Sequence, residues 1–122
     1  MQHLESQLQR NCFSYFRYKY PKLARLFFAV PNGGFRNARE AGIMKAEGVT
    51  KGVADTILLV PNRDFHGLCI EFKTETGRQS PHQKTWQAEV EAQGYKYEII
   101  KNLDTFIAVI ENYLSLRQET LK

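Results

Sequence analysis

Two stretches of the chain repeat apolar residues at the spacing of an amphipathic helix. They are residues 3–20, with Leu4, Leu8, Cys12, Tyr15 and Phe16, and residues 103–116, with Leu103, Ile107, Ile110 and Leu114. Two further helices are predicted mainly by their ends. Residues 36–47 are rich in Ala and Glu and precede Gly48, and residues 80–93 begin with Ser80-Pro81 and end at Gly94.

Four short apolar runs predict β-strands, namely residues 26–30, 53–60, 67–73 and 95–100. The turn-forming residues 61–64 separate the second run from the third, so we expect these two strands to form a hairpin. Both strands are apolar on both alternating faces, which indicates a sheet covered on both sides. We therefore predict a single α/β domain over residues 1–122. It has a small mixed four-stranded sheet flanked by helices on both faces, in the order α-β-α-β-β-α-β-α.

The composition agrees with one globular domain that has a mildly basic surface. The 122 residues are 43% apolar and carry a net charge of +4, which is compatible with a polyanionic partner. We find no signal peptide and no apolar run near the roughly 18 residues of a membrane span. We expect a cytoplasmic protein in which Cys12 and Cys69 are free, buried thiols.

Three polar residues interrupt the apolar hairpin. Asp55 stands near the start of one strand, and Glu71 and Lys73 stand near the end of the next, two residues apart and so on one face. If the strands pair so that residue numbers sum to 126, residues 61–65 form an ordinary hairpin loop and Asp55 faces Glu71. The simplest hairpin therefore predicts two carboxylates side by side with a lysine next to them.

This set of side chains suits metal-assisted hydrolysis of a phosphodiester bond. Neighbouring carboxylates repel each other, and a divalent cation such as Mg²⁺ relieves the repulsion by accepting an oxygen from each. The cation can polarise a phosphoryl oxygen and lower the pKa of a bound water. Lys73 could orient or deprotonate that water, or stabilise charge on the phosphate.

The pattern of Asp55 followed by Glu71-Phe72-Lys73 resembles the PD-(D/E)XK nuclease superfamily. Within that superfamily, the sequence motifs resemble those of the VRR-NUC (virus-type replication-repair nuclease) family. The matching motifs are Gly48-Val49-Thr50-Lys51-Gly52-Val53-Ala54-Asp55, Cys69-Ile70-Glu71-Phe72-Lys73, Gln83-Lys84-Thr85-Trp86 and Pro31-Asn32-Gly33-Gly34. The resemblance covers roughly residues 26–100. Ala54 departs from the proline of the superfamily name, at a position that supplies no chemistry.

The resemblance implies a restriction-endonuclease-like fold and an endonuclease that depends on Mg²⁺ or Mn²⁺. It also implies branched DNA, such as a Holliday junction, as substrate, and a homodimer with replication or repair partners, in a bacterial cell or phage-infected host. Asp55 and Glu71 would bind the metal, with the Phe72 carbonyl as a third ligand, and Lys73 would be catalytic. Gln83 would match the family's glutamine, and Glu5 a carboxylate that relatives supply from the first helix.

Several of these residues also have plain structural readings. Gln83 stands three residues after Ser80, where a glutamine completes a capping box, and Glu5 could face solvent. The candidates for contacts with DNA could equally form a solvated polar surface or a turn. They are Asn32, Arg36, Arg39, Lys51, Arg78 and Lys84.

Two other functions fit the same residues. One is a catalytically silent DNA-binding subunit of a replication or repair complex, although no site position is lost. The other is a restriction-type nuclease, although 122 residues leave little room for an added specificity region.

Overall fold

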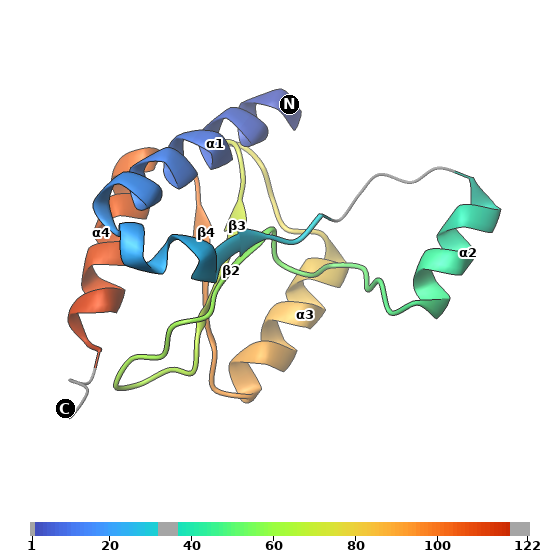
Figure 1. Cartoon of the computed structure of the whole chain (residues 1–122). Coiled ribbons are helices and arrows are strands. Elements are labelled where there is room, and N and C mark those ends of the chain that lie inside the picture. The colour runs from blue at the N-terminus through green and yellow to red at the C-terminus, as the bar shows by residue number, and fades with distance from the viewer. Residues whose placement is uncertain (1, 32–36, 118–122) are drawn as a thin grey trace.

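The computed structural model describes residues 2–31 and 37–117. The elements follow the predicted order, with one short 3₁₀ helix, η1, added after the first helix (Figure 1). They are α1 (Gln2–Lys19), η1 (Pro21–Leu26), β1 (Phe27–Ala29), α2 (Ala38–Ala46), β2 (Thr56–Leu58), β3 (Leu68–Phe72), α3 (Pro81–Ala92), β4 (Lys96–Ile100) and α4 (Leu103–Ser115).

The four strands form one mixed sheet in the order β1-β2-β3-β4, which confirms the predicted fold class. β1 and β3 both pair antiparallel with β2, whereas β4 runs parallel to β3. The predicted hairpin register is confirmed, because Ile57 pairs with Cys69 and Thr56 with Ile70. The paired part of the hairpin ends at Leu58 and Leu68, so the connection between the strands spans residues 59–67 rather than 61–65.

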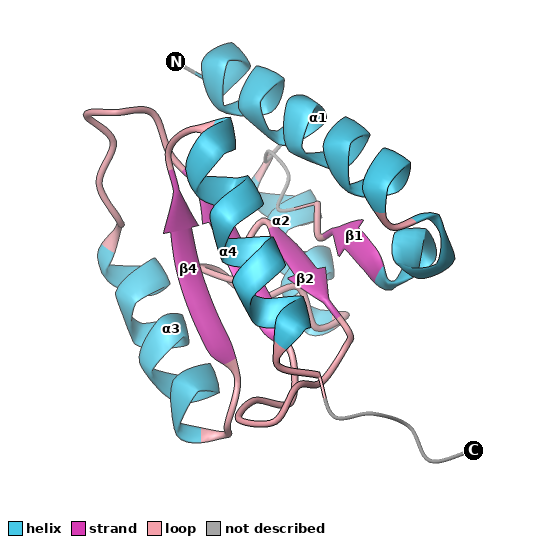
Figure 2. Ribbon diagram, turned by 90° about the vertical axis from the view of Figure 1, so that its left-hand side faces the viewer, coloured by secondary structure: helices cyan, strands magenta, loops and turns pink. Residues whose placement is uncertain are grey.

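Helices cover both faces of the sheet (Figure 2). α1 and α4 lie on one face, where their apolar stripes meet the sheet in the main core around Phe16, Phe27 and Phe106. α3 lies on the other face, where Trp86 packs on a smaller cluster with Cys69 and Tyr97. α2 stands apart from both layers and has no buried residue (Figure 1).

Two of the predicted strands are shorter than the sequence indicated. The run 53–60 is paired as a strand only over Thr56–Leu58, and 26–30 only over Phe27–Ala29. Gly52 adopts a φ of +85°, which turns the chain just before the strand. At the other end, the Val60 carbonyl accepts a hydrogen bond of 2.7 Å from the Tyr113 hydroxyl instead of continuing the ladder.

The predicted glycines at the ends of two helices and the two predicted free thiols are confirmed. Gly48, with a φ of +101°, follows α2, and Gly94, with a φ of +93°, follows α3. Cys12 and Cys69 are free and buried. Among the residues described, no helix combines the length and the apolar character needed to span a membrane.

Candidate active site

Asp55 lies directly before β2 and is fixed from two sides. The Val30 amide donates to the Asp55 carbonyl oxygen at 2.8 Å, and the Phe72 amide donates to Asp55 Oδ2 at 2.7 Å. Continuing the β2–β3 register by one residue from Thr56 and Ile70 places Asp55 opposite Glu71. The hairpin therefore brings the two predicted carboxylates together at the end of the sheet.

Glu71 is completely buried, and its two carboxylate oxygens have different surroundings. Oε1 accepts hydrogen bonds from the Tyr97 hydroxyl at 2.5 Å and from Gln79 Nε2 at 3.1 Å. Oε2 is buried and receives no hydrogen bond. Its charge is balanced by Lys73, whose Nζ lies 3.3 Å away in an ion pair without hydrogen-bond geometry. One oxygen of this carboxylate is thus held in place while the other keeps a free acceptor position.

Lys73 directly follows β3. Its side chain lies on the same face as Glu71, with which it forms an ion pair. Its backbone amide donates to the Ile100 carbonyl at 3.0 Å, so β4 holds this end of the chain. The Lys73 side chain is 14% exposed, so it is not completely sealed from solvent.

The electrostatic environment favours a cation beside Asp55. Burial raises the pKa of Asp55, and the negative charges of Glu71 and Glu5 raise it further. The Phe72 amide and the charge of Lys73 act in the opposite direction without cancelling the effect. Burial and the hydrogen bond to Glu71 also raise the pKa of Tyr97, so its hydroxyl remains a donor.

Glu5, in the first turn of α1, lies near enough for its charge to affect Asp55. Across residues 2–31 and 37–117, however, no three His, Cys, Asp or Glu side chains are grouped closely enough to hold a metal ion together. The structure thus places Asp55 and Glu71 opposite each other across the hairpin, and the charge of Glu5 acts on Asp55 from α1.

Gln83 forms the capping box of α3. Its Oε1 accepts from the Ser80 amide at 2.8 Å, and Ser80 Oγ accepts from the Gln83 amide at 3.2 Å. Gln83 nevertheless lines the same cavity as Asp55. The glutamine that reaches Glu71 is Gln79, in the loop before α3.

Sequence reasoning missed both Gln79 and Tyr97. Gln79 stood in a polar loop, and Tyr97 had the character of an ordinary strand residue, since tyrosine is common in strands. Only the pairing of β4 with β3, which sets Tyr97 beside Cys69, brings its hydroxyl toward Glu71.

A cavity of about 1170 Å³ opens beside Asp55, between α2 and the first turn of α3. Gly52, in the loop between α2 and β2, packs directly against the start of α3. A Cβ at this position would lie 2.4 Å from the His82 carbonyl oxygen, so only glycine fits there. Lys51 and Lys45 line this cavity. A smaller cavity of about 430 Å³, between β4 and α4, contains none of the site carboxylates discussed above.

The predicted DNA contacts lie at separate places. Lys51 lines the cavity, whereas Arg39, Arg78 and Lys84 are exposed on α2, the loop before α3, and α3. Asn32 and Arg36 lie outside the described residues.

Comparisons with known proteins agree with this geometry. The model of the VRR-NUC domain matches residues 5–102. A solved structure described as a "VRR_NUC domain protein" superposes with a TM-score of 0.82 at 26% sequence identity, over 93% of this chain and 90% of that one. No curated protein matches. The matched segment contains every carboxylate and lysine of the site, from Glu5 to Lys73.

Proposed function

This chain belongs to the VRR-NUC domain family, a nuclease-type DNA-processing domain, and from that premise we propose that it is a divalent-metal-dependent endodeoxyribonuclease. The observation that carries the proposal is the buried Glu71 carboxylate. It has one oxygen fixed by Tyr97 and Gln79 and one without a hydrogen bond, across the hairpin from Asp55.

The side chains present fit Mg²⁺ or Mn²⁺. Such cations take hard oxygen ligands, often one or two carboxylates completed by water and a phosphate. Asp55 and Glu71 would hold the ion, with the Phe72 carbonyl and Glu5 as further oxygen donors. When bound, the ion supplies a Lewis acid that polarises the phosphoryl oxygen and acidifies a coordinated water. Burial and then the negative charge of Glu71 raise the pKa of Asp55, and a cation bound between the two carboxylates would offset both effects, which supports this assignment.

Lys73 contributes a fixed positive charge. Its ammonium group pairs with Glu71 at 3.3 Å, so it is suited to stabilise negative charge that develops on the phosphate. In the proposed hydrolysis, a water molecule gives up a proton to solvent as its oxygen bonds to phosphorus, the bond from phosphorus to the leaving oxygen breaks, and the leaving oxygen takes up a proton from solvent. The cavity beside Asp55 gives the DNA strand a way in, with Lys51 on its wall.

Branched DNA and a homodimer complete the proposal. A twofold dimer presents two sites to a symmetric branched substrate such as a Holliday junction. The support on this chain is the outer edge of the sheet, where Leu26, Phe28 and Leu59 are exposed by 39%, 37% and 53%. β1 is an edge strand, and apolar side chains at an open sheet edge favour association.

The test is cleavage of labelled four-way junction, flap and linear duplex in Mg²⁺, Mn²⁺ or EDTA. We expect junction cleavage that requires metal and is abolished by Asp55→Asn and by Lys73→Ala. Matched controls are Asp64→Asn and Lys101→Ala, which alter exposed residues whose side chains contact none of the site side chains. Cleavage that survives EDTA or both site variants contradicts the mechanism. Tight binding without cleavage in any metal favours a silent DNA-binding subunit, and cleavage of one short duplex sequence favours a restriction-type enzyme.

A further inference from the structure

The positive charge of this chain is concentrated at its N-terminal end. Residues 1–26 carry five basic side chains and one acidic one, a net charge of +4. The remaining 96 residues carry twelve basic and twelve acidic side chains and are neutral overall. The net charge of the whole protein, also +4, is therefore that of α1 and η1.

Four of these basic residues fall on repeating positions of their helices. Arg10 and Arg17 are seven residues apart, two turns of an α-helix, and therefore lie on one side of α1. Lys22 and Arg25 are three residues apart, one turn of a 3₁₀ helix, and so share one side of η1. We call these four residues the basic track.

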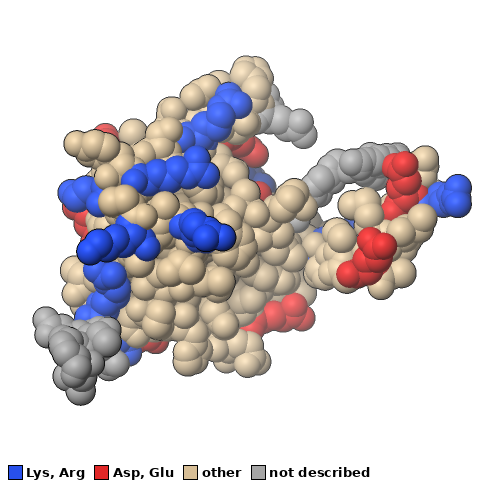
Figure 3. All heavy atoms as spheres, in the orientation of Figure 1, with Lys and Arg blue, Asp and Glu red and all other residues tan. Residues whose placement is uncertain are grey.

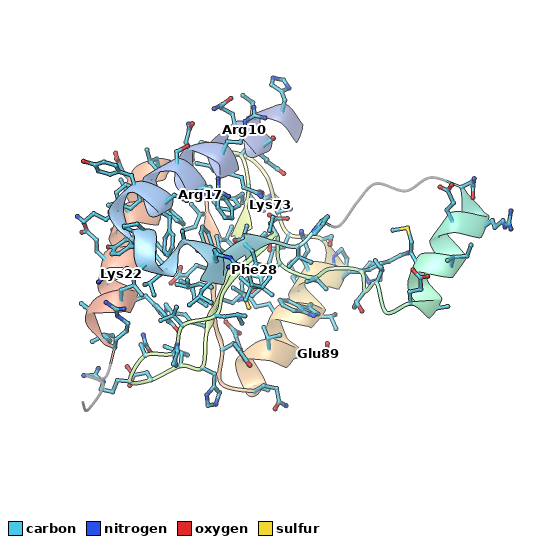
Figure 4. All side chains as sticks on the ribbon, viewed as in Figure 1. Arg10, Arg17, Lys22, Phe28, Lys73 and Glu89 are labelled. Carbon is cyan, nitrogen blue, oxygen red and sulfur yellow. The ribbon has the colours of Figure 1, made fainter. Side chains whose placement is uncertain are left out.

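The track is exposed and unneutralised. All four side chains are exposed, and within the part of the chain that the structure describes none of them forms an ion pair. On the face shown in Figure 3, Lys and Arg side chains gather over α1 and η1. Figure 4 labels Arg10, Arg17 and Lys22, which follow one another from α1 into η1. Arg10 Nη2 donates to Gln7 at 2.9 Å, and the Arg17 guanidinium lies 5.2 Å from the centre of the Phe13 ring, so each of these side chains contacts a neighbour on α1.

The track starts near the carboxylates and leads away from them. Glu5, whose charge reaches Asp55, is in the first turn of α1. From Glu5 to Arg17 the helix advances about 18 Å, at about 1.5 Å per residue. That length corresponds to about five base pairs of duplex at about 3.4 Å each, long enough to follow one strand of a duplex arm.

We propose that the basic track binds the phosphate backbone of a duplex DNA arm that extends from the active site. The choice of DNA as ligand rests on the proposed function. An anionic membrane fits less well. A helix that lies on a membrane inserts an apolar face, but the apolar face of α1 is already buried in the core through Cys12, Phe13 and Phe16.

The experiment measures DNA binding in EDTA, so that cleavage plays no part. Labelled four-way junction and short linear duplex are titrated with protein at a series of KCl concentrations, with fluorescence anisotropy as the readout. The track variant is Arg10→Gln/Arg17→Gln/Lys22→Gln. A matched control with the same change of charge is Arg63→Gln/Lys101→Gln/Arg117→Gln, at exposed positions off α1 and η1. A third variant, Lys51→Gln/Arg78→Gln/Lys84→Gln, tests the surface predicted from the sequence.

We expect the track variant to bind about tenfold or more weakly and to lose about three units of salt slope, since each phosphate contact contributes about 0.9. Circular dichroism should show it folded, and the matched control should keep the slope of the unmodified protein. Equal losses in the track variant and the matched control overturn the proposal, because total charge would then explain binding. Loss only in the third variant also overturns it, as does a track variant that loses binding to phosphatidylserine vesicles but keeps DNA binding.

Failure here is separable from failure of the proposed function. If the protein never cleaves DNA, but the track variant binds DNA with a smaller salt dependence than the unmodified protein, the basic track binds DNA and the proposed nuclease activity is wrong. If the protein cleaves junctions, but the track variant binds DNA as tightly as the unmodified protein, the proposed nuclease activity stands and the role of the basic track is wrong.

Discussion

The Tyr97 hydroxyl donates a hydrogen bond to Glu71 Oε1 at 2.5 Å, from the strand that runs parallel to that of Glu71. Gln79 donates to the same oxygen, whereas Oε2 receives no hydrogen bond. Two donors on one oxygen fix the orientation of the carboxylate, so the direction of the free oxygen is set before any ligand binds. Residues that orient a ligand in this way affect metal affinity although they do not touch the metal.

Replacing Tyr97 by Phe tests this orienting role. The variant removes a hydrogen bond to a buried carboxylate. Such a bond stabilises a fold by about 1.5–3 kcal/mol, so the free energy of unfolding of the variant should fall by about that amount. We expect the Mn²⁺ concentration for half-maximal cleavage to rise about 10- to 100-fold, while the rate at saturating Mn²⁺ changes little. Tyr95→Phe, at the residue directly before the same strand, is the control. A fall in the maximal rate with an unchanged Mn²⁺ requirement contradicts the role.

The Asp55 pKa predicts how stability varies with pH in the absence of metal. Because the folded protein holds this pKa above its ordinary value of 3.8, the folded state binds more protons than the unfolded state in that interval. The free energy of unfolding therefore decreases as the pH rises from about 3.8 through the folded pKa, and the loss persists at neutral pH.

Urea unfolding of the unmodified protein and of Asp55→Asn, over a series of pH values in EDTA, measures this loss. We expect the variant to gain stability relative to the unmodified protein as the pH rises through that interval. Mg²⁺ at neutral pH should raise the melting temperature of the unmodified protein and not that of the variant. Asp64→Asn, at an exposed position, should behave like the unmodified protein in both tests. An Asp55→Asn variant that loses stability relative to the unmodified protein as the pH rises argues against a raised Asp55 pKa.

The hairpin was predictable from the sequence because all its determinants are local. A register that leaves a short connection between the two apolar runs sets Asp55 opposite Glu71, and the observed pairing has this register. Tyr97 was not predictable, because its place depends on the parallel register of β3 and β4 across the intervening helix. The short β2 also escaped prediction, since the turn at Gly52 follows from its close contact with α3. Site residues that are positioned by the hairpin could be predicted from the sequence, and those that are positioned by packing between distant parts of the chain could not.

Gln83 is predicted to have two roles, which a pair of variants can separate. Its Oε1 caps α3 through Ser80, while the side chain also lines the cavity beside Asp55. Gln83→Ala and Ser80→Ala should each lower the free energy of unfolding by about 0.5–2 kcal/mol, since either breaks the capping box. We expect Gln83→Ala alone to reduce junction cleavage, by at least about tenfold, because only that variant removes an amide from the cavity. Equal cleavage by the two variants would leave Gln83 with the cap alone.

The apolar edge of the sheet predicts the oligomeric state. Phe28 lies on the edge strand β1 and is 37% exposed, with Leu26 and Leu59 beside it. If this edge forms the dimer interface, Phe28→Glu places a charge in an apolar contact and should produce a monomer, measured by light scattering at several protein concentrations. Ile43→Glu, at a 47% exposed position on α2, is the matched control and should leave the dimer intact. Because a symmetric junction needs two sites for paired cuts, the monomer should still nick junctions but lose simultaneous cleavage of both strands. An unmodified protein that is monomeric and yet makes paired cuts would rule out this use of the edge.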